Sequence, residues 1–505
     1  MHDPDQDPVA ESLQPHNPLV NHMSVRTPGA SDTSADPASG RASLGWMAVV
    51  LLVSAPLLVT LFLALWHTPF PISEAVALLE DVSKKSVESF VIPDASYYRP
   101  FYHLSLMAIW RSSSPLDTRL ADIKLLHFVP VAFLVLLFLW QMRPRTGTQA
   151  AAAAVAMAVL VGSPGFRDNI ELPLAYTAVG MPLALAAWVL VNREWRFWHP
   201  VAIVLFAIVA IGFKEQGLVI VPVVGVAWLM RAPSARTGLV VTLVALTVAY
   251  VTARLVWHGP LPLFEQSMGL GFSTLEPSEA AARYGGFPYW LYAYNGLSTM
   301  ANVLFSEPTR GLFFISRDIA YLRVQPWEVV QLVSSGLMTA CIAWWGIQRV
   351  RDEARSGWTV ESRTFAALVV SLAACGVLSF DYSRDRLGGM ALVFYAVSAY
   401  YATCALCHAM GAVARARAVL VGVALMLLAV TWQVRAVGTV EYVRRTAWRN
   451  QIEWLADLPK RRAEFVDRHE YRDIMESMVE QGTRPGSSEP TLYPRWLART
   501  FLPRP

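Results

Sequence analysis

Several side chains that can do acid-base chemistry lie around a helix-starting proline in the stretch from residue 93 to residue 104. Its sequence, Pro-Asp-Ala-Ser-Tyr-Tyr-Arg-Pro-Phe-Tyr-His-Leu, brings Asp94, Arg99 and His103 together with several aromatic rings. Further acids lie just upstream, at Glu74, Glu80, Asp81 and Glu88. A carboxylate held beside a cavity at a membrane surface can accept a proton from a hydroxyl group. The loop that carries these residues is therefore the first place where we expect chemistry.

Glu74 follows Ser73, a residue type that favours the N-cap of a helix. Apolar residues then recur at helical spacing, at Val76, Leu79, Val87 and Phe90, which predicts an amphipathic helix along the membrane. In one interpretation, Glu74 only complements the helix dipole. In the other, its carboxylate faces a cavity and acts as a base. Residue types alone leave both interpretations open.

A second candidate is Gly212-Phe213-Lys214-Glu215-Gln216-Gly217, which interrupts an otherwise apolar stretch. Opposite charges within such a stretch are costly unless they turn the chain at a surface or bind a ligand. Lys214 and Glu215 can pair with each other in a simple turn. The flanking glycines favour instead a lysine that meets an anion.

A third candidate is the short loop Phe-Asp-Tyr-Ser-Arg-Asp-Arg, residues 380–386. Its two arginines, Arg384 and Arg386, can bind a phosphate in bidentate fashion. A solvated loop with internal ion pairs is the alternative. Cys404 and Cys407 also have the spacing of a metal or redox pair, but they lie in an apolar run with no second pair nearby, so we expect them to pack in a helix.

Composition places the chain among multi-span membrane proteins. Of 505 residues, 54% are hydrophobic and only 16% are charged, which is too apolar for a soluble chain of this length. The net charge of +4 is small and is concentrated in short loops, so nucleic acid is not expected as a partner. The expected fold is all-α.

Eleven apolar runs predict eleven transmembrane helices. They lie at about 45–66, 119–142, 148–164, 172–191, 200–213, 217–230, 237–257, 327–348, 364–380, 387–408 and 418–434. Arginines gather in every second loop, on the same side as the N-terminus. Because positive charge favours the cytoplasmic side, this pattern predicts a cytoplasmic N-terminus. Residues 288–306 are apolar enough for a twelfth span, but such a span would move the arginines of 349–363 outward, so an amphipathic helix at the interface is preferred.

Three regions follow from this pattern. Residues 1–44 are rich in Asp, Pro, Ser and Gly and are expected to form a disordered cytoplasmic tail. Residues 45–434 form the membrane domain, with a first outer loop at 67–118 and a second at 258–326. Residues 435–505 are expected to form a small helical cap outside the membrane.

Four features together resemble the GT-C superfamily of integral membrane glycosyltransferases, especially its protein O-mannosyltransferase-like and tetratricopeptide-associated O-mannosyltransferase-like branches. They are a first span, a large outer loop with an early acid, Tyr98-Arg99-Pro100 opening a helix, and Lys214-Glu215-Gln216-Gly217 between two short apolar runs. The resemblance covers about residues 45–230.

The resemblance implies that Glu74 is the catalytic base and that Arg99 and Lys214 meet the donor phosphate, with Tyr98, His103 and Glu215 in support. Where the family has paired acids, Glu74 is followed by Ala75, so Asp94 is a second candidate for the base. Glu80 and Asp81 come third. Arg384 and Arg386 are assigned to the phosphate only because of their charge and side.

The activity implied by the resemblance is transfer of a sugar from a polyprenyl phosphate to an acceptor hydroxyl of a glycan, lipid or protein. It would occur on the outer face of the plasma (inner) membrane and would require no cofactor. Clustered carboxylates are compatible with a divalent metal, but no pattern selects one.

The alternative is a multi-span transporter or lipid flippase, which also uses charges inside helices. Repeated halves with matched broken helices are common there, and only one broken helix, at 214–217, is evident. A scaffold or sensor would not need that interruption.

Overall fold

A computed structural model describes most of the chain outside its two ends. The described residues are 37–68, 82, 86, 87, 99–166, 168–171, 178–258, 268–270, 273–275, 277–286, 288–305, 318–324, 326–353, 357–380, 385–411, 419, 422–424, 426–441, 443 and 444. The helices of the first half are α1 (Pro37–His67), α4 (Pro100–Trp110), α5 (Leu116–Met142), α6 (Gly147–Val161), α7 (Asp168–Glu171), α8 (Gly180–Val191), α9 (Trp198–Phe213), α10 (Ile220–Leu229) and α11 (Thr237–His258). The helices of the second half are α13 (Pro277–Tyr284), α14 (Trp290–Phe305), α16 (Pro326–Glu353), α17 (Val360–Leu378), α18 (Gly389–Gly411) and a last helix, Gly422–Glu441, called here the C-terminal helix.

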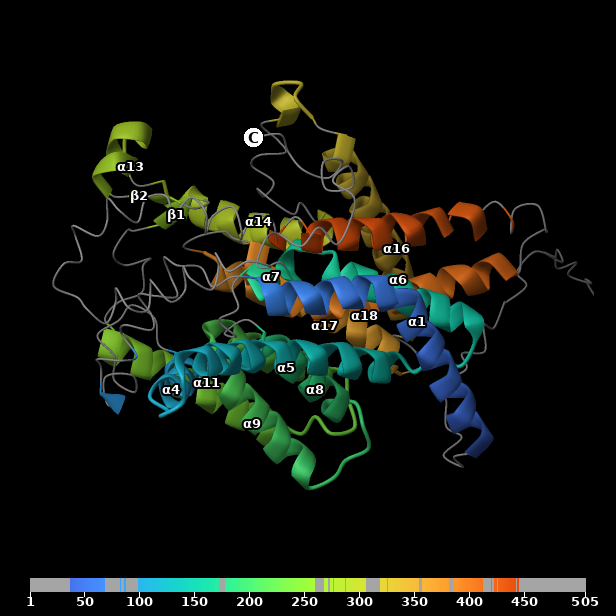
Figure 1. Ribbon diagram of the computed structural model, residues 1–505, viewed down its shortest axis with the longest axis horizontal. Helices are drawn as coiled ribbons and strands as arrows, with labels where there is room; N and C mark the ends of the chain where they lie inside the picture. The colour runs from blue at the N-terminus through green and yellow to red at the C-terminus, as the bar shows by residue number, and fades with distance from the viewer. Residues whose placement is uncertain are drawn as a thin grey trace, which may run out of the picture.

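Short 3-10 turns connect some of these helices, namely η1 (Pro164–Phe166), η2 (Glu215–Val219) and η3 (Asp385–Gly388). The described part of the chain is helical, as expected, apart from one short antiparallel pair between α11 and α13, β1 (Met268–Leu270) with β2 (Ser273–Leu275). Figure 1 shows α1, α5 and α18 running roughly along the long axis of the molecule, with α4 at one end of this bundle.

Seven helices in the described part of the chain are long and apolar enough to cross a membrane. They are α1, α5, α11, α16, α17, α18 and the C-terminal helix. Four more apolar helices are shorter, at Gly147–Val161, Gly180–Val191, Trp198–Phe213 and Glu215–Leu229. Each of the eleven apolar runs thus contains a helix, but only seven helices have the length for a full crossing by themselves.

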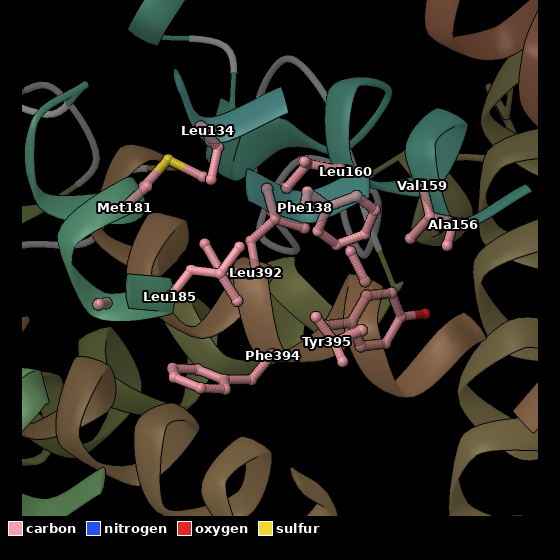
Figure 2. Close-up of a cluster of buried hydrophobic side chains, with 14 of the residues drawn as sticks. Leu134, Phe138, Ala156, Val159, Leu160, Met181, Leu185, Leu392, Phe394 and Tyr395 are labelled. Carbon is pink, nitrogen blue, oxygen red and sulfur yellow. The ribbon is translucent and has the colours of Figure 1, made fainter. Parts of the chain in front are cut away.

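The core forms around α6 and α18, which pack against each other along their length. Alanines fill much of α6, and small side chains let helix backbones approach closely in a membrane. Figure 2 shows Leu134 and Phe138 of α5, Met181 of α8 and Leu392 of α18 in contact around the α6 residues. Close backbone crossings occur where α14 meets α17, since Gly296 lies against the Gly376 carbonyl.

Two expected boundaries differ from the structure. The helix α1 begins at Pro37, inside the segment expected to be a tail, because proline is favoured in the first turn of a helix. The C-terminal helix continues to Glu441, so the expected change from membrane domain to cap at residue 435 falls within a helix.

The segment 288–306 contains α14, whose buried side is polar. Asn295, Ser298, Thr299 and Asn302 face the neighbouring helices, whereas Leu297 is exposed. The helix packs against α16, α17 and α18. Its polar face is thus turned toward protein rather than water, and its interfacial position remains a prediction.

Candidate functional site

The helix α4 begins where the sequence predicts, at Pro100, directly after Arg99. Proline fits the first helical position because its missing N–H would lack an intrahelical partner there. The ring nitrogen Nδ1 of His103 lies 2.9 Å from the Arg99 carbonyl oxygen, one turn back along the chain. Phe101 packs against Gly212, where a β-carbon would collide with its ring. These contacts hold Arg99 at the end of α9.

The apolar stretch around Lys214 is broken, as the sequence predicts. The helix α9 ends at Phe213, and Lys214 has an extended backbone, with φ of −160° and ψ of 143°. The 3-10 turn η2 then leads into α10. Gly217 lies so close to the backbone of Ala210 and Ile211 that any β-carbon there would collide with α9. The glycine thus has a packing role in the break, because it allows η2 to fold back on α9.

Arg99 and Glu215 form a bidentate ion pair across 116 residues of sequence. Arg99 Nε donates to Glu215 Oε2 at 3.2 Å, and Arg99 Nη2 donates to Glu215 Oε1 at 3.1 Å. The two side chains are 14% and 29% exposed. The pair joins the start of α4 to the break between α9 and α10, so two of the three predicted motifs meet in space.

Charges nearby control the ionisation of Glu215. Burial by itself would raise the pKa of this carboxyl, but the charges of Arg99 and Lys214 and the hydrogen bonds from Arg99 outweigh it and lower the pKa to about 2. Glu215 is therefore ionised at neutral pH and is a weak base, since an efficient general base has a pKa near the working pH. This fits a supporting role, in which Glu215 orients Arg99.

Lys214 is only 2% exposed and lies next to this pair in the chain. Arg99 and Lys214 both act on the Glu215 carboxylate through their charge. The low local dielectric strengthens such attractions. Arg99 was expected to meet a phosphate directly, whereas here one edge of its guanidinium contacts Glu215.

The remaining predicted site residues cannot be placed beside this pair. Glu74, Glu80, Asp81, Asp94, Tyr98 and Arg384 lie outside the described residues. Arg386 belongs to η3, but its side chain is outside the described part. No group of three or more His, Cys, Asp or Glu side chains is placed to hold a metal ion among the described residues. Both Cys404 and Cys407 are free thiols in α18.

The C-terminal helix contains a buried arginine that the apolar pattern did not predict. Arg435 was assigned to the start of the cap, yet it is 1% exposed. Its Nη1 donates to the Gln331 carbonyl at 3.2 Å, to Ser334 Oγ at 2.9 Å and to Ser335 Oγ at 2.6 Å, all on α16. Trp432, one turn earlier, has its ring centroid 4.1 Å from the Arg435 Cζ. The Ser-Ser pair inside an apolar run is the sequence signal that could have indicated a polar partner.

A second buried arginine, Arg444, lies just beyond the end of this helix and pairs with Glu441. Arg444 Nε and Nη2 donate to the two carboxylate oxygens of Glu441 at 3.0 and 2.8 Å, and neither residue is exposed by more than 1%. Ionisable residues inside a membrane domain are costly and often functional. The chain therefore buries charge near its C-terminal helix as well as at the Arg99–Glu215 pair.

These helices define a multi-pass helical membrane protein with a charged break between α9 and α10. No family model matches the chain, and no curated protein or solved structure matches it either.

Proposed function

We propose that the chain is a membrane glycosyltransferase that moves a sugar from a polyprenyl phosphate to an acceptor hydroxyl on the outer face of the plasma membrane. The observation that carries the proposal is the ion pair between Arg99 and Glu215. It joins the two motifs on which the resemblance to the GT-C superfamily rests, the Tyr-Arg-Pro segment and the Lys-Glu turn. The proposal includes eleven spans, with the four shorter apolar helices crossing the membrane and the break at Lys214 at its outer surface.

In the proposed reaction, the acceptor oxygen forms a bond to the anomeric carbon while the bond from that carbon to the phosphate oxygen breaks. A carboxylate of the first outer loop, Glu74 or Asp94, takes the acceptor proton. Negative charge develops on the departing lipid phosphate, and Lys214 and Arg99 stabilise it. Glu215 fixes the orientation of Arg99. Arg384 and Arg386 are further candidates for the phosphate.

Turnover with purified protein tests this proposal. Transfer from radiolabelled polyprenyl-phosphate mannose and glucose is measured for the wild type, Glu74→Gln and Asp94→Asn. Loss of the true base is expected to lower the rate about 100- to 10,000-fold. Arg283→Gln is the control, because Arg283 is exposed and pairs with Glu279 one turn away. Full activity in both acid variants would remove catalysis from this loop.

A transporter or lipid flippase is the second candidate, and the buried Arg435 favours it. Charges enclosed in a helix bundle are typical of pathways through a membrane. Flux of a fluorescent polyprenyl phosphate across proteoliposomes distinguishes the two. Flux in the wild type that Arg435→Gln abolishes, without any sugar transfer, would favour the transporter over the glycosyltransferase.

A further inference from the structure

Three loops at one end of the helices carry six arginines. Arg143 and Arg145 follow α5, Arg193 and Arg196 follow α8, and Arg231 and Arg236 follow α10. All six are exposed, and within the part of the chain that the structure describes none of them forms an ion pair. Glu194 is the one acid in these loops.

Hydrogen bonds and ring contacts fix the loops to one another. Ser234 donates from its backbone to the Val191 carbonyl at 3.1 Å and from Oγ to the Arg193 carbonyl at 2.8 Å. His199 Nδ1 lies 3.0 Å from Ser234 Oγ. The loop after α5 is joined to the loop after α8 through Trp140 of α5, whose ring contacts Arg143 and Arg193. The six arginines therefore lie on one preformed surface.

Trp140 brings two guanidinium groups onto one indole. Arg143 Cζ lies 4.5 Å from the ring centroid, and Arg193 Cζ lies 4.3 Å from it. Burial and then the nearby charges of Arg193 and Arg145 lower the pKa of Arg143, which means that like charges crowd there. Stacking on the ring offsets part of this repulsion. An anion between the guanidinium groups would offset the rest.

The dipoles of the neighbouring helices do not neutralise the positive charge of the arginines. The helices α5, α8 and α10 end at these loops and present partial negative charge, but α6, α9 and α11 begin at the same loops and present partial positive charge. The two sets nearly cancel. Six arginines against one glutamate leave a strongly positive surface.

Exposed aromatic rings border the arginines and set their depth. Phe197 is 78% exposed, Trp195 is 42% exposed and Trp198 is 41% exposed. Arg236 stacks on Trp195, with its Cζ 3.9 Å from the ring centroid. Tryptophan concentrates at the level of lipid headgroups, where its ring is half in contact with hydrocarbon and half with water. At that level, arginines beside these rings would lie next to the phosphate groups of lipids.

We propose that this surface, formed by the six arginines with Trp140, Trp195, Phe197 and Trp198 and called here the Arg–Trp patch, binds the phosphodiester headgroup of an anionic phospholipid. Arginine suits this ligand because its planar guanidinium donates two parallel hydrogen bonds to one phosphate. The proposal is independent of the transferase reaction, since the patch is formed by loops on the side away from the Lys214 break.

Native mass spectrometry of the full chain in a neutral detergent tests the patch. The protein is titrated with phosphatidylglycerol or with phosphatidylcholine of the same acyl chains. We expect the wild type to prefer phosphatidylglycerol, and we expect Arg143→Gln/Arg193→Gln to weaken its binding about 30-fold, because each basic residue near an anionic surface contributes a factor of about five. The control Arg283→Gln/Arg323→Gln, which removes two exposed arginines from the predicted second outer loop, should change binding less than about twofold.

Three results would overturn the proposal. They are equal binding of the two lipids by the wild type, unchanged phosphatidylglycerol binding in the Arg143/Arg193 variant, and displacement of the lipid by inorganic phosphate beyond what sodium chloride of equal ionic strength achieves. The last result would assign the patch to free anions. If the variant does not fold, the wild type alone decides, because the preference should vanish at about 1 M salt, where screening reaches about 3 Å. A preference that persists there contradicts the proposal.

Discussion

At the scale of single residues, the ion pair between Arg99 and Glu215 is the contact on which the candidate site depends. A hydrogen-bonded pair of charges that is mostly enclosed contributes about 1–3 kcal/mol. Each partner is also the reason that the other tolerates burial, since an unpaired buried charge is costly. The pair therefore stabilises the fold and orients the Arg99 guanidinium at the same time.

Replacing Glu215 by glutamine should lower the free energy of unfolding by about 1–3 kcal/mol at pH 7. The pKa of Glu215 falls from 4.5 to about 2 on folding. A carboxyl with a lowered folded pKa stabilises the protein fully above its unfolded pKa and loses that contribution as the pH falls through the folded pKa. The difference between wild type and Glu215→Gln should therefore be constant above about pH 5 and shrink toward pH 2. Thermal unfolding in detergent across this range measures it.

A double-mutant cycle with Arg99→Gln separates the pair from other effects. The double variant should be less destabilised than the two single variants added together. Additive losses of stability, or a stability difference that does not change with pH, would mean that the pair contributes nothing measurable to the free energy of unfolding.

The break that carries Lys214 and Glu215 could be predicted from the sequence, whereas the burial of Arg435 could not. Lys214 and Glu215 interrupt an apolar run, and that interruption is visible in one dimension. Arg435 closes an apolar run and therefore indicates the end of a span. Its partners, Ser334 and Ser335, come from α16, about a hundred residues earlier. Only the packing of the C-terminal helix on α16 brings them together.

At the scale of elements, the break between α9 and α10 requires a glycine at residue 217. A methyl group there would collide with the backbone of Ala210 and Ile211. Gly217→Ala should therefore destabilise the protein by about 1–3 kcal/mol, the usual cost of overpacking. Thermal unfolding of the purified protein gives the value.

Gly225→Ala is the matched control, because it lies in α10 with nothing within 4 Å of its added β-carbon. Alanine favours a helix over glycine by up to about 1 kcal/mol, so this variant should be neutral or slightly more stable. Equal stability of the two variants would show that η2 does not need its close approach to α9.

Helix positions followed from apolar periodicity, but helix lengths did not. Apolar runs at 148–164 and 172–191 predicted full spans, whereas α6 and α8 have 15 and 12 residues. A 12-residue helix is about 18 Å long, well short of the ~30 Å hydrocarbon core. After α6, Gly162 and Pro164 favour a break, and the 3-10 turn η1 begins there.

At the scale of the whole molecule, the number of crossings decides which residues share a side. If the shorter helices cross the membrane with their adjoining turns, the chain crosses three times between Arg145 and Gln216 and once more before Arg231. Reporter fusions after Arg145, Gln216 and Arg231 should then report cytoplasm, outside and cytoplasm. Without those crossings, all three would report one side, and the Lys214 break would not face outward.

Orientation and the Arg–Trp patch depend on the same molecule-wide distribution of charge. Arginines gather in the loops after α5, α8 and α10, while the candidate site lies at the opposite ends of α9 and α10. The positive-inside pattern predicts a cytoplasmic patch and an outward site. A donor lipid in the outer leaflet would then reach Arg99 and Lys214 from the membrane plane.

Binding of polyprenyl phosphate tests the central claim most directly, because every proposed sugar donor shares this lipid phosphate. Its affinity is measured for the wild type, Lys214→Gln and Arg283→Gln, with phosphatidylglycerol as competitor and with thermal unfolding of each variant alongside. We predict that the wild type binds polyprenyl phosphate in preference to phosphatidylglycerol, that Lys214→Gln weakens binding about 10- to 100-fold through loss of a charged contact of about 1.5–3 kcal/mol, and that Arg283→Gln binds like the wild type. A wild type that shows no such preference, or a folded Lys214→Gln variant with unchanged affinity, would contradict the account.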